Sequence, residues 1–430
     1  MKKMTEGKTH SHKINKTKHL GKVLYLLMVL VGLTSISCHK RSFEGMLLIV
    51  QETSGENGAS SALALVEPER PEQDPVVLVD EFYKIGSPEL SYLGDVVLFQ
   101  AKKNPGDFWQ IWEYNLESEA LKQLTFADSD CEDPTYLPDG KIVYSRFVAN
   151  YSGYHVLETC DPQDSSIQQI TFGPVDFNAA TVLMDGRILA VAKEVHPNPK
   201  KEQLMVMRPD GTKIELFYES EKDKVIASGK GVFETSDGRI VFSEKEQGSL
   251  AGAQWISVDY NRPMQSRTPF EVKSESQIKR LVNVARPLPK KLPSAVKPET
   301  ETALLVCMDA NLSENPEQEI QRKSVQVELL GLQGSLGAVD LEKDGSVYLK
   351  IQADMPFRMQ TLDSEGTVVQ GPSSWLQMRP NERRGCVGCH AGHTRVPENR
   401  QPLAVQKEPV EIPPYRETIM ASRLIKDDKK

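Results

Sequence analysis

Residues 135–147 read TYLPDGKIVYSRF, an Asp-Gly turn followed by a run of β-forming residues. Asp-Gly is a common turn of β-hairpins, and alternation of apolar and polar residues is typical of a half-buried strand. The pattern recurs in TVLMDGRILAVAK (181–193) and ETSDGRIVFSEK (234–245), and in SYLGDVVLFQAK (91–102) with an aspartate turn that reads Gly-Asp. The aligned aspartates are 44, 46 and 52 residues apart, at Asp95, Asp139, Asp185 and Asp237.

Shorter strand-like runs between these turns repeat as well, for example YHVLETCD (154–161) before IQQITFG (167–173). Each unit therefore has three or four strands, and its period predicts the four-stranded blade of a β-propeller. The units resemble TolB-type propeller repeats in the Leu124-Thr125 strand and the Pro138-Asp139-Gly140 turn. With residues 46–80 as a further unit, we expect residues 39–290 to form a propeller of five or six blades.

A different domain is expected after the propeller. The stretch RPLPKKLPSAVKPET (286–300) is rich in proline and lysine and predicts a linker, which we place at 291–301. Alternating segments joined by Asp-Gly and Glu-Gly turns then fill residues 302–405, which predicts a compact antiparallel, sandwich-like domain. Residues 406–430 are expected to be a tail. No segment shows a convincing helical period, so the predicted fold class is all-β.

The N-terminal 38 residues are typical of an export signal. A lysine-rich stretch precedes the uncharged run VLYLLMVLVGLTSI (23–36), which suits the apolar core of a signal peptide. Ser37 and Cys38 follow, as at the end of a bacterial lipobox, so Cys38 is the predicted lipidation site. The alternatives are ordinary secretion with Cys38 as a bystander, or an uncleaved anchor. Each places the rest of the chain outside the cytoplasm, and we expect a membrane-anchored lipoprotein in the periplasm or on the outer surface.

Charge and cysteine content narrow the function further. The formal net charge of −8 gives no reason to expect nucleic-acid binding. Three cysteines lie outside the recognisable motifs: Cys131, Cys160 and Cys307. An oxidising compartment permits one disulfide among them, with Cys131–Cys160 the first pair to test, and three buried thiols are the alternative.

The chemistry of the chain is concentrated in GCVGCHAGH, residues 385–393. Cys386-X-X-Cys389-His390 is the attachment pattern of c-type haem, in which two thiols bond one porphyrin edge and the adjacent histidine reaches the iron. A zinc site would need His393 as a fourth ligand and would be crowded within eight residues. A redox dithiol is expected in a βαβ setting, which is absent here. The pattern favours one covalent haem c, with zinc as the less favoured cofactor.

The second axial ligand of that haem is left open. Candidates are His393, which could also replace His390 on the iron, and Met355, Met359, Met378, His155 and His196. An open position is equally compatible with the sequence, and the identity of the ligand would set the redox potential. Arginines that could pair with haem propionates, or form a solvated rim, surround the motif: Arg379, Arg383, Arg384, Arg395 and Arg400.

The residues around the motif resemble the middle domain of the hydrazine synthase alpha subunit, most closely over residues 340–404. The resemblance is carried by Asp344-Gly345-Ser346, Leu362-Asp363, Gly366, Trp375, Pro380, Glu382 and Pro397-Glu398-Asn399-Arg400. It implies an N-terminal propeller and a haem held by the motif.

The resemblance also shows departures. In that family a tyrosine just after the motif serves as axial ligand, and the histidine of the motif binds zinc. Thr394 stands at the matching position here, with His393 beside it, and the chain has no second Cys-X-X-Cys-His before Lys430. Hydrazine synthase activity itself is therefore not expected.

The sequence predicts an exported monohaem c-type protein that works in electron transfer or small-ligand haem chemistry. It would belong to a multi-subunit redox system, with a redox protein or other subunits as partners and a lipid anchor in the membrane. The alternative is a surface scaffold whose propeller recognises a protein or glycan and whose haem is structural. A third hypothesis is an oxidoreductase with an open iron site, so the sequence does not decide whether the protein is an enzyme.

Overall fold

The computed structural model describes residues 43–55, 58–70, 72–151, 153–227, 231–249, 252–270, 282–312, 323–388 and 399–412. Residues 1–43 and 44–430 form two separate units, and all regular structure described lies in the second. The described residues contain strands and one short 3-10 helix but no α-helix, which confirms the predicted all-β class. No described helix is long and apolar enough to cross a membrane. The predicted signal segment and Cys38 lie outside the described residues.

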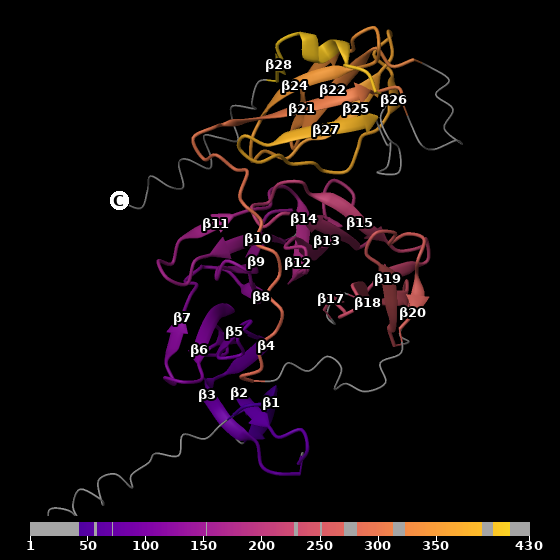
Figure 1. The fold of residues 1–430 in the computed structure, drawn as a ribbon. Helices are drawn as coiled ribbons and strands as arrows, with labels where there is room; N and C mark the ends of the chain where they lie inside the picture. The colour runs from indigo at the N-terminus through magenta and orange to yellow at the C-terminus, as the bar shows by residue number, and fades with distance from the viewer. Residues whose placement is uncertain are drawn as a thin grey trace, which may run out of the picture. The chain divides into compact units, whose positions relative to one another are not determined.

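Five antiparallel sheets follow one another between Leu47 and Pro269 (Figure 1). The first has three strands: β1 (Leu47–Gly55), β2 (Gly58–Val66) and β3 (Val76–Phe82). The next three have four strands each: β4 (Lys84–Leu90), β5 (Val96–Lys102), β6 (Gln110–Asn115) and β7 (Leu121–Gln123); β8 (Cys131–Tyr136), β9 (Ile142–Val148), β10 (Tyr154–Cys160) and β11 (Ile167–Gln169); β12 (Val175–Val182), β13 (Ile188–Glu194), β14 (Gln203–Met207) and β15 (Glu215–Glu219). The fifth contains β16 (Lys224–Ile226), β17 (Phe233–Glu234), β18 (Arg239–Glu246), β19 (Gln254–Asp259) and β20 (Thr268–Pro269).

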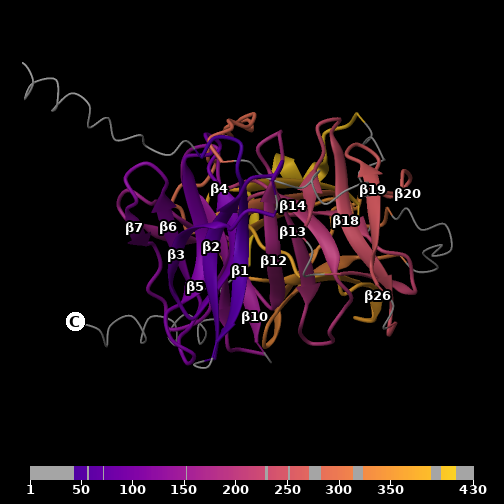
Figure 2. The ribbon, with the colours of Figure 1, turned by 90° about the horizontal axis from the view of Figure 1, so that it is seen from below.

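Neighbouring sheets bury their faces against each other, as propeller blades do. Leu98 of β5 packs with Tyr144 of β9, and Val143 of β9 packs with Ala190 of β13 in the next layer. A third layer joins β12–β15 to β16–β20 through buried aliphatic and aromatic side chains. Figure 2 shows the succession of sheets from below. The repeated turns at Asp95, Asp139, Asp185 and Asp237 each connect two paired strands of one blade, as the hairpin pattern predicts.

The C-terminal domain is a sandwich of two four-stranded sheets. One has the order β27-β21-β24-β28, from β27 (Arg383–Gly388), β21 (Thr302–Asp309), β24 (Val347–Gln352) and β28 (Val410–Glu411). The other has the order β23-β22-β25-β26, from β23 (Gly334–Asp340), β22 (Gln326–Gly331), β25 (Arg358–Leu362) and β26 (Val368–Gln370). The 3-10 helix η2 spans Leu403–Gln406.

The first of these sheets is mixed, whereas a purely antiparallel domain was predicted. Both of its edge strands, β27 and β28, run parallel to their neighbours. Long connections precede both strands, and a parallel pairing requires such a connection. Strand β28 lies within the expected tail, so residues 410–411 of that tail pair with the domain.

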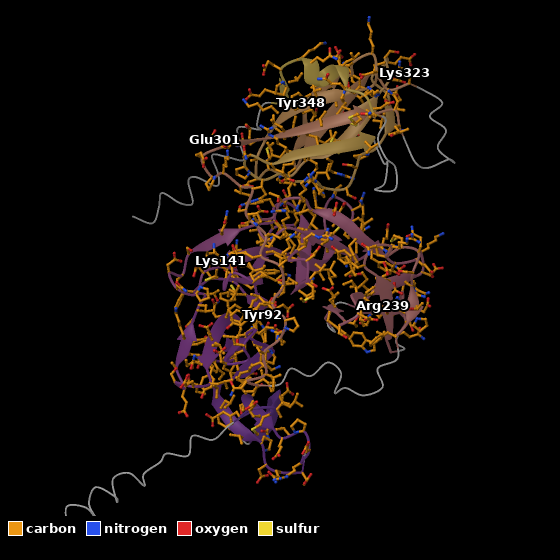
Figure 3. The ribbon with its side chains drawn as sticks, in the orientation of Figure 1. Tyr92, Lys141, Arg239, Glu301, Lys323 and Tyr348 are labelled. Carbon is orange, nitrogen blue, oxygen red and sulfur yellow. The ribbon has the colours of Figure 1, made fainter. Side chains whose placement is uncertain are left out.

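Residues 282–297, here termed the connector, cross the blade turns (Figure 1). The Asn283 and Lys290 backbone amides donate to the carbonyl oxygens of Gly94 at 2.8 Å and Met184 at 3.0 Å. The Arg286 guanidinium lies over the ring of Tyr92, labelled in Figure 3, at 5.0 Å. The start of the proline- and lysine-rich stretch 286–300 is therefore hydrogen-bonded to the propeller, through the backbone amides of Arg286 and Lys290.

Two of the repeated glycines allow a comparison that isolates this contact. Gly186 and Gly140 occupy equivalent Asp-Gly turns with φ of +89° and +90°. A Cβ on Gly186 would lie 1.9 Å from the Lys290 carbonyl oxygen, whereas one on Gly140 meets no described atom within 4 Å. We expect Gly140→Ala to lower the free energy of unfolding by about 1 kcal/mol, the cost of the left-handed backbone. We expect Gly186→Ala to cost about 2 kcal/mol more, because the connector must move. Equal urea midpoints for the two variants would show that the connector does not rest on this turn.

The three remaining cysteines are free thiols, which is the alternative that the sequence left open. Cys131, Cys160 and Cys307 are buried and unbridged. Cys131 is on β8 and Cys160 on β10, with β9 between them. Two strand spacings amount to about 9.6 Å, which exceeds the reach of a disulfide. The preferred pair Cys131–Cys160 is therefore wrong.

Candidate functional site

Strand β27 carries the first residue of the predicted attachment motif. It pairs in parallel with β21, so that Arg383 lies beside Leu304 and Cys386 beside Cys307. β27 is the edge strand of its sheet, and its last residue is Gly388. Cys389, His390, His393 and Arg395 lie outside the described residues. The structure therefore fixes where the motif begins.

The glycine inside the motif is set by a close backbone approach. A Cβ on Gly388 would lie 2.4 Å from the carbonyl oxygen of Leu312 and 2.8 Å from its Cβ. Gly385, three residues earlier, is open, since the nearest atom to an added Cβ would be Val306 Cγ1 at 3.8 Å. Only glycine fits between the two motif cysteines at position 388.

The thiol of Cys386 lies at the margin of the core of the C-terminal domain. It is half-buried and packs against the cluster that contains Cys307, Leu305 and Met378. Burial raises the pKa of the Cys386 thiol, and the nearby Arg384 guanidinium opposes that rise. The thiol is therefore protonated near neutral pH.

A tight turn delivers the chain into β27. The Glu382 amide donates to the Arg379 carbonyl oxygen at 2.9 Å, and Asn381 has a φ of 67°. Proline at the second position and asparagine at the third, left-handed position are what a type II turn favours. The Pro380-Asn381 pair is thus the local reason why the chain reverses immediately before the motif.

Glu382 holds this turn to the propeller. Its side chain is 2% exposed. One carboxylate oxygen accepts from the Arg379 amide at 2.8 Å. The other accepts from the Lys213 amide at 3.0 Å and from the Arg384 guanidinium at 2.9 Å. A buried carboxylate with three donors is well satisfied, and it joins a propeller turn to the start of β27.

Further contacts to the propeller come from residues 375–379, which with the turn form a clamp segment, Trp375–Arg384. The Trp375 indole donates to the His196 carbonyl oxygen at 2.6 Å, and the Gln377 amide group donates to that of Ile170 at 2.9 Å. The buried Arg379 guanidinium pairs with Asp354 at 2.9 Å and lies over the Phe172 ring at 5.0 Å. This role of the clamp segment was not foreseen. The one available signal was the series of family-like residues Trp375, Pro380 and Glu382.

Three of the five arginines around the motif are engaged within the protein. Arg379 pairs with Asp354, Arg384 with Glu382, and Arg400 with Asp344. Their charges are therefore largely compensated, against the expectation that they serve haem propionates. Arg383 is exposed on β27 and is the described arginine that best suits that role.

The described candidates for a second axial ligand fall into two groups. Met378 is fully buried in the core of the C-terminal domain, and Met355 and Met359 pack against that core. His196 lies in the propeller, with its ring 4.5 Å from that of Tyr151. His155 is excluded, because both ring nitrogens face carboxylates: Nδ1 lies 2.8 Å from Asp176 and Nε2 lies 3.3 Å from Glu132. The proposal of His155 as a ligand is wrong.

His155 instead predicts a pH effect. Hydrogen bonds to Asp176 and Glu132 outweigh burial and raise the pKa of His155 from 6.5 to about 9. A raised histidine pKa gives stability that is complete below pH 6.5 and lost as the pH rises through 9. We expect the free energy of unfolding to fall by about 1 kcal/mol per pH unit between pH 7 and 8.5, since one proton is worth 1.36 kcal/mol per unit. His155→Gln should remove that slope in urea titrations. An unchanged slope in the variant would contradict the assignment.

The described residues fit a haem-attachment site in three respects. The edge strand β27 delivers a half-buried cysteine to the start of the motif, and the close contact at position 388 requires the glycine found there. An exposed guanidinium, Arg383, lies on the same strand. The donor set of the full motif, two thiols and an imidazole, is the one that c-type haem uses.

Comparison with known proteins agrees with this geometry. Residues 303–391 match the family model of the hydrazine synthase alpha subunit middle domain, and the match ends just after His390. The C-terminal domain is hydrazine synthase alpha-like. The curated hydrazine synthase subunit alpha of Kuenenia stuttgartiensis is 40% identical over 62 residues. Those residues are 14% of this chain and 8% of that protein.

The likeness in fold extends through the propeller. A solved chain of Kuenenia stuttgartiensis hydrazine synthase superposes with a TM-score of 0.69 at 16% identity, and the match covers 84% of this chain and 71% of that one. TolB from Acinetobacter baumannii gives a TM-score of 0.40 at 12% identity, over 79% and 66% of the two chains. The first of these shows that propeller and hydrazine synthase alpha-like domain occur together in one known fold.

Proposed function

We propose that the chain is an exported c-type haem protein, with one haem held by Cys386, Cys389 and His390. The observation that carries the proposal is the family match over residues 303–391, which includes the whole motif. When bound, the haem would supply reversible one-electron chemistry or a site for a small ligand. Cys386 and Cys389 would hold it covalently, His390 would face the iron, and Arg383 would neutralise a propionate.

The residues of the protein would mainly fix the position of the haem. The parallel pairing of β27 with β21 and the contact at Gly388 hold the start of the motif, and Glu382 holds β27 to the propeller. A rigid support keeps the distance to an electron-exchange partner constant. The relative is named as a subunit, which supports a role inside a multi-subunit redox assembly. The lipid anchor at Cys38 and a periplasmic or outer-surface location belong to the same proposal.

Absorption spectra of the full chain test the redox role. The chain is produced in a host with haem c assembly and compared in the oxidised and reduced states, with and without carbon monoxide. A Soret band, sharp reduced bands and a reversible redox titration are expected for electron transfer. A reduced spectrum that shifts with carbon monoxide would assign the open-iron, small-ligand role instead. A chain without a Soret band would overturn both.

A binding function of the propeller is a second candidate. A cavity of about 410 Å³, here termed the inner-strand cavity, lies between residues of β4, β8 and β12, the first strands of three consecutive blades. The buried Ser145 hydroxyl next to this cavity lacks a hydrogen-bond partner among the described residues. This favours recognition by the propeller independently of the haem. A redox-inert haem together with ligand binding that survives Cys389→Ser would favour this second function.

A further inference from the structure

The cavity among the inner strands is built on a repeated irregularity. In β4, β8 and β12 the register shifts at one place, between Gly86 and Glu89, between Glu132 and Thr135, and between Asn178 and Thr181. Each bulge contains one residue with positive φ: Ser87 at 45°, Asp133 at 49° and Ala179 at 49°. All three line the cavity.

These bulges lower the conformational stability of three consecutive blades. A left-handed backbone costs a residue other than glycine about 1–2 kcal/mol, and such residues gather at binding and catalytic sites. The bulges also link two blades at the cavity wall, because Ser87 Oγ donates to the Asp133 carboxylate at 2.7 Å. Repetition at equivalent places argues for a built site.

A buried polar group borders the same cavity without a partner. Ser145 on β9 is 0% exposed, pairs in register with Glu132 and lines the cavity. Its hydroxyl has no hydrogen-bond partner among the described residues. Leaving such a group unpaired costs about 1–3 kcal/mol, and because the side chain is fully covered in the ligand-free chain, the cavity wall must shift slightly for a ligand to satisfy it.

The charge around the cavity is negative. Four carboxylates lie at or next to its wall, those of Glu89, Glu132, Asp133 and Asp176. Two cations offset them, because Arg286 pairs with Glu89 at 3.1 Å and His155 bridges Glu132 and Asp176. Four negative and two positive charges leave a net charge of −2. A cavity with this excess favours a cation.

An organic cation suits the cavity better than a metal ion. Among the described residues no group of three or more His, Cys, Asp or Glu side chains is arranged to hold a metal. The volume of about 410 Å³ is in the range of small-molecule sites. An ammonium group offers three donors, and both the Ser145 hydroxyl and the carboxylates can accept them.

We propose that the inner-strand cavity of the propeller binds a small organic amine in its ammonium form, with Ser145 and Asp133 as direct partners. The ammonium group would lie between the β8 bulge and the wall of β9, and the apolar part of the ligand would contact Ala179, Ala180 and Val232. The site is separate from the motif at Cys386 and does not depend on haem.

Titration calorimetry of the full chain with spermidine tests the proposal, with 1,4-butanediol and succinate as neutral and anionic controls. Spermidine should bind at one site per chain, and the controls should not bind. Ser145→Ala and Asp133→Asn should each weaken binding about tenfold, as expected for a lost hydrogen bond to a charged group. Asparagine tolerates the left-handed backbone of position 133. Asp164→Asn, at an exposed turn of the same blade, should leave binding unchanged.

The stability of the ligand-free chain gives a second readout. Because the Ser145 hydroxyl is unpaired, Ser145→Ala should leave the melting temperature unchanged or raise it. A lower melting temperature would mean that the hydroxyl is already satisfied, and it would count against the proposal. Absence of spermidine binding would overturn the proposal. Equal binding by all three variants would also overturn it, because it would show only general attraction of a cation to an acidic protein.

Discussion

Replacing Glu382 by alanine should lower the free energy of unfolding by about 3–5 kcal/mol, the usual cost of breaking a buried ion pair. The carboxylate is 2% exposed and accepts from Arg379, Lys213 and Arg384. Its removal leaves a largely buried guanidinium and two backbone donors without their acceptor. Urea unfolding of the full chain measures the change. Glu382→Gln keeps one acceptor oxygen and should fall between alanine and the native residue.

Glu342 provides the matched control. It is also a glutamate of the C-terminal domain that pairs with a cation, but its partner Lys407 is 64% exposed. Such surface pairs contribute about 0–1 kcal/mol, so Glu342→Ala should shift the urea midpoint little. If both alanine variants shifted the midpoint alike, Glu382 would not be the link between turn and propeller.

Gly388→Ala adds only one methyl group, yet it should strongly reduce both the stability of the chain and its haem loading. The added methyl group would lie 2.4 Å from the Leu312 carbonyl oxygen, so either β27 or residue 312 must move. We expect a loss of about 2 kcal/mol in the free energy of unfolding, as in other overpacked positions. We also expect several-fold less covalent haem per chain, because Cys386 and Cys389 flank the displaced residue. Haem absorbance relative to protein absorbance gives the loading.

Gly385→Ala is the control within the same motif. Its added methyl group would meet only Val306 Cγ1 at 3.8 Å, an ordinary contact. Haem loading and stability should therefore stay near those of the native chain. A similar loss in both variants would mean that the motif tolerates no side chain at all, and the Leu312 contact would lose its explanatory role.

Local patterns predicted the blades well because propeller strands pair with their neighbours in sequence. The Asp-Gly turns at Asp139 and Asp185 do lie between consecutive paired strands, β8–β9 and β12–β13. Proline and lysine content predicted a linker at 291–301, but it says nothing about distant partners of the connector such as the Gly186 turn. The left-handed residues Ser87 and Asp133 were missed for the same reason. Each of the two precedes a proline. That is a weak sequence signal, which can be interpreted only once the cavity beside both residues is known.

The sequence predicted the chemistry of the site, but it predicted less well the contacts that hold the site in place. Cys386-X-X-Cys389-His390 is local and readable, whereas the parallel pairing of β27 with β21 joins residues far apart in sequence. The same limit explains the disulfide error, because the separation of Cys131 and Cys160 depends on the intervening strand. The role of Glu382 depends on Lys213 in the propeller, which no spacing rule indicates.

The most direct test of the central claim is the mass of the full chain after production in a host that assembles c-type haem. Intact mass spectrometry followed by peptide mapping locates any covalent group. The proposal predicts one haem per chain, on the peptide that contains Cys386 and Cys389. A chain with no added haem, or with haem on a different peptide, would contradict it.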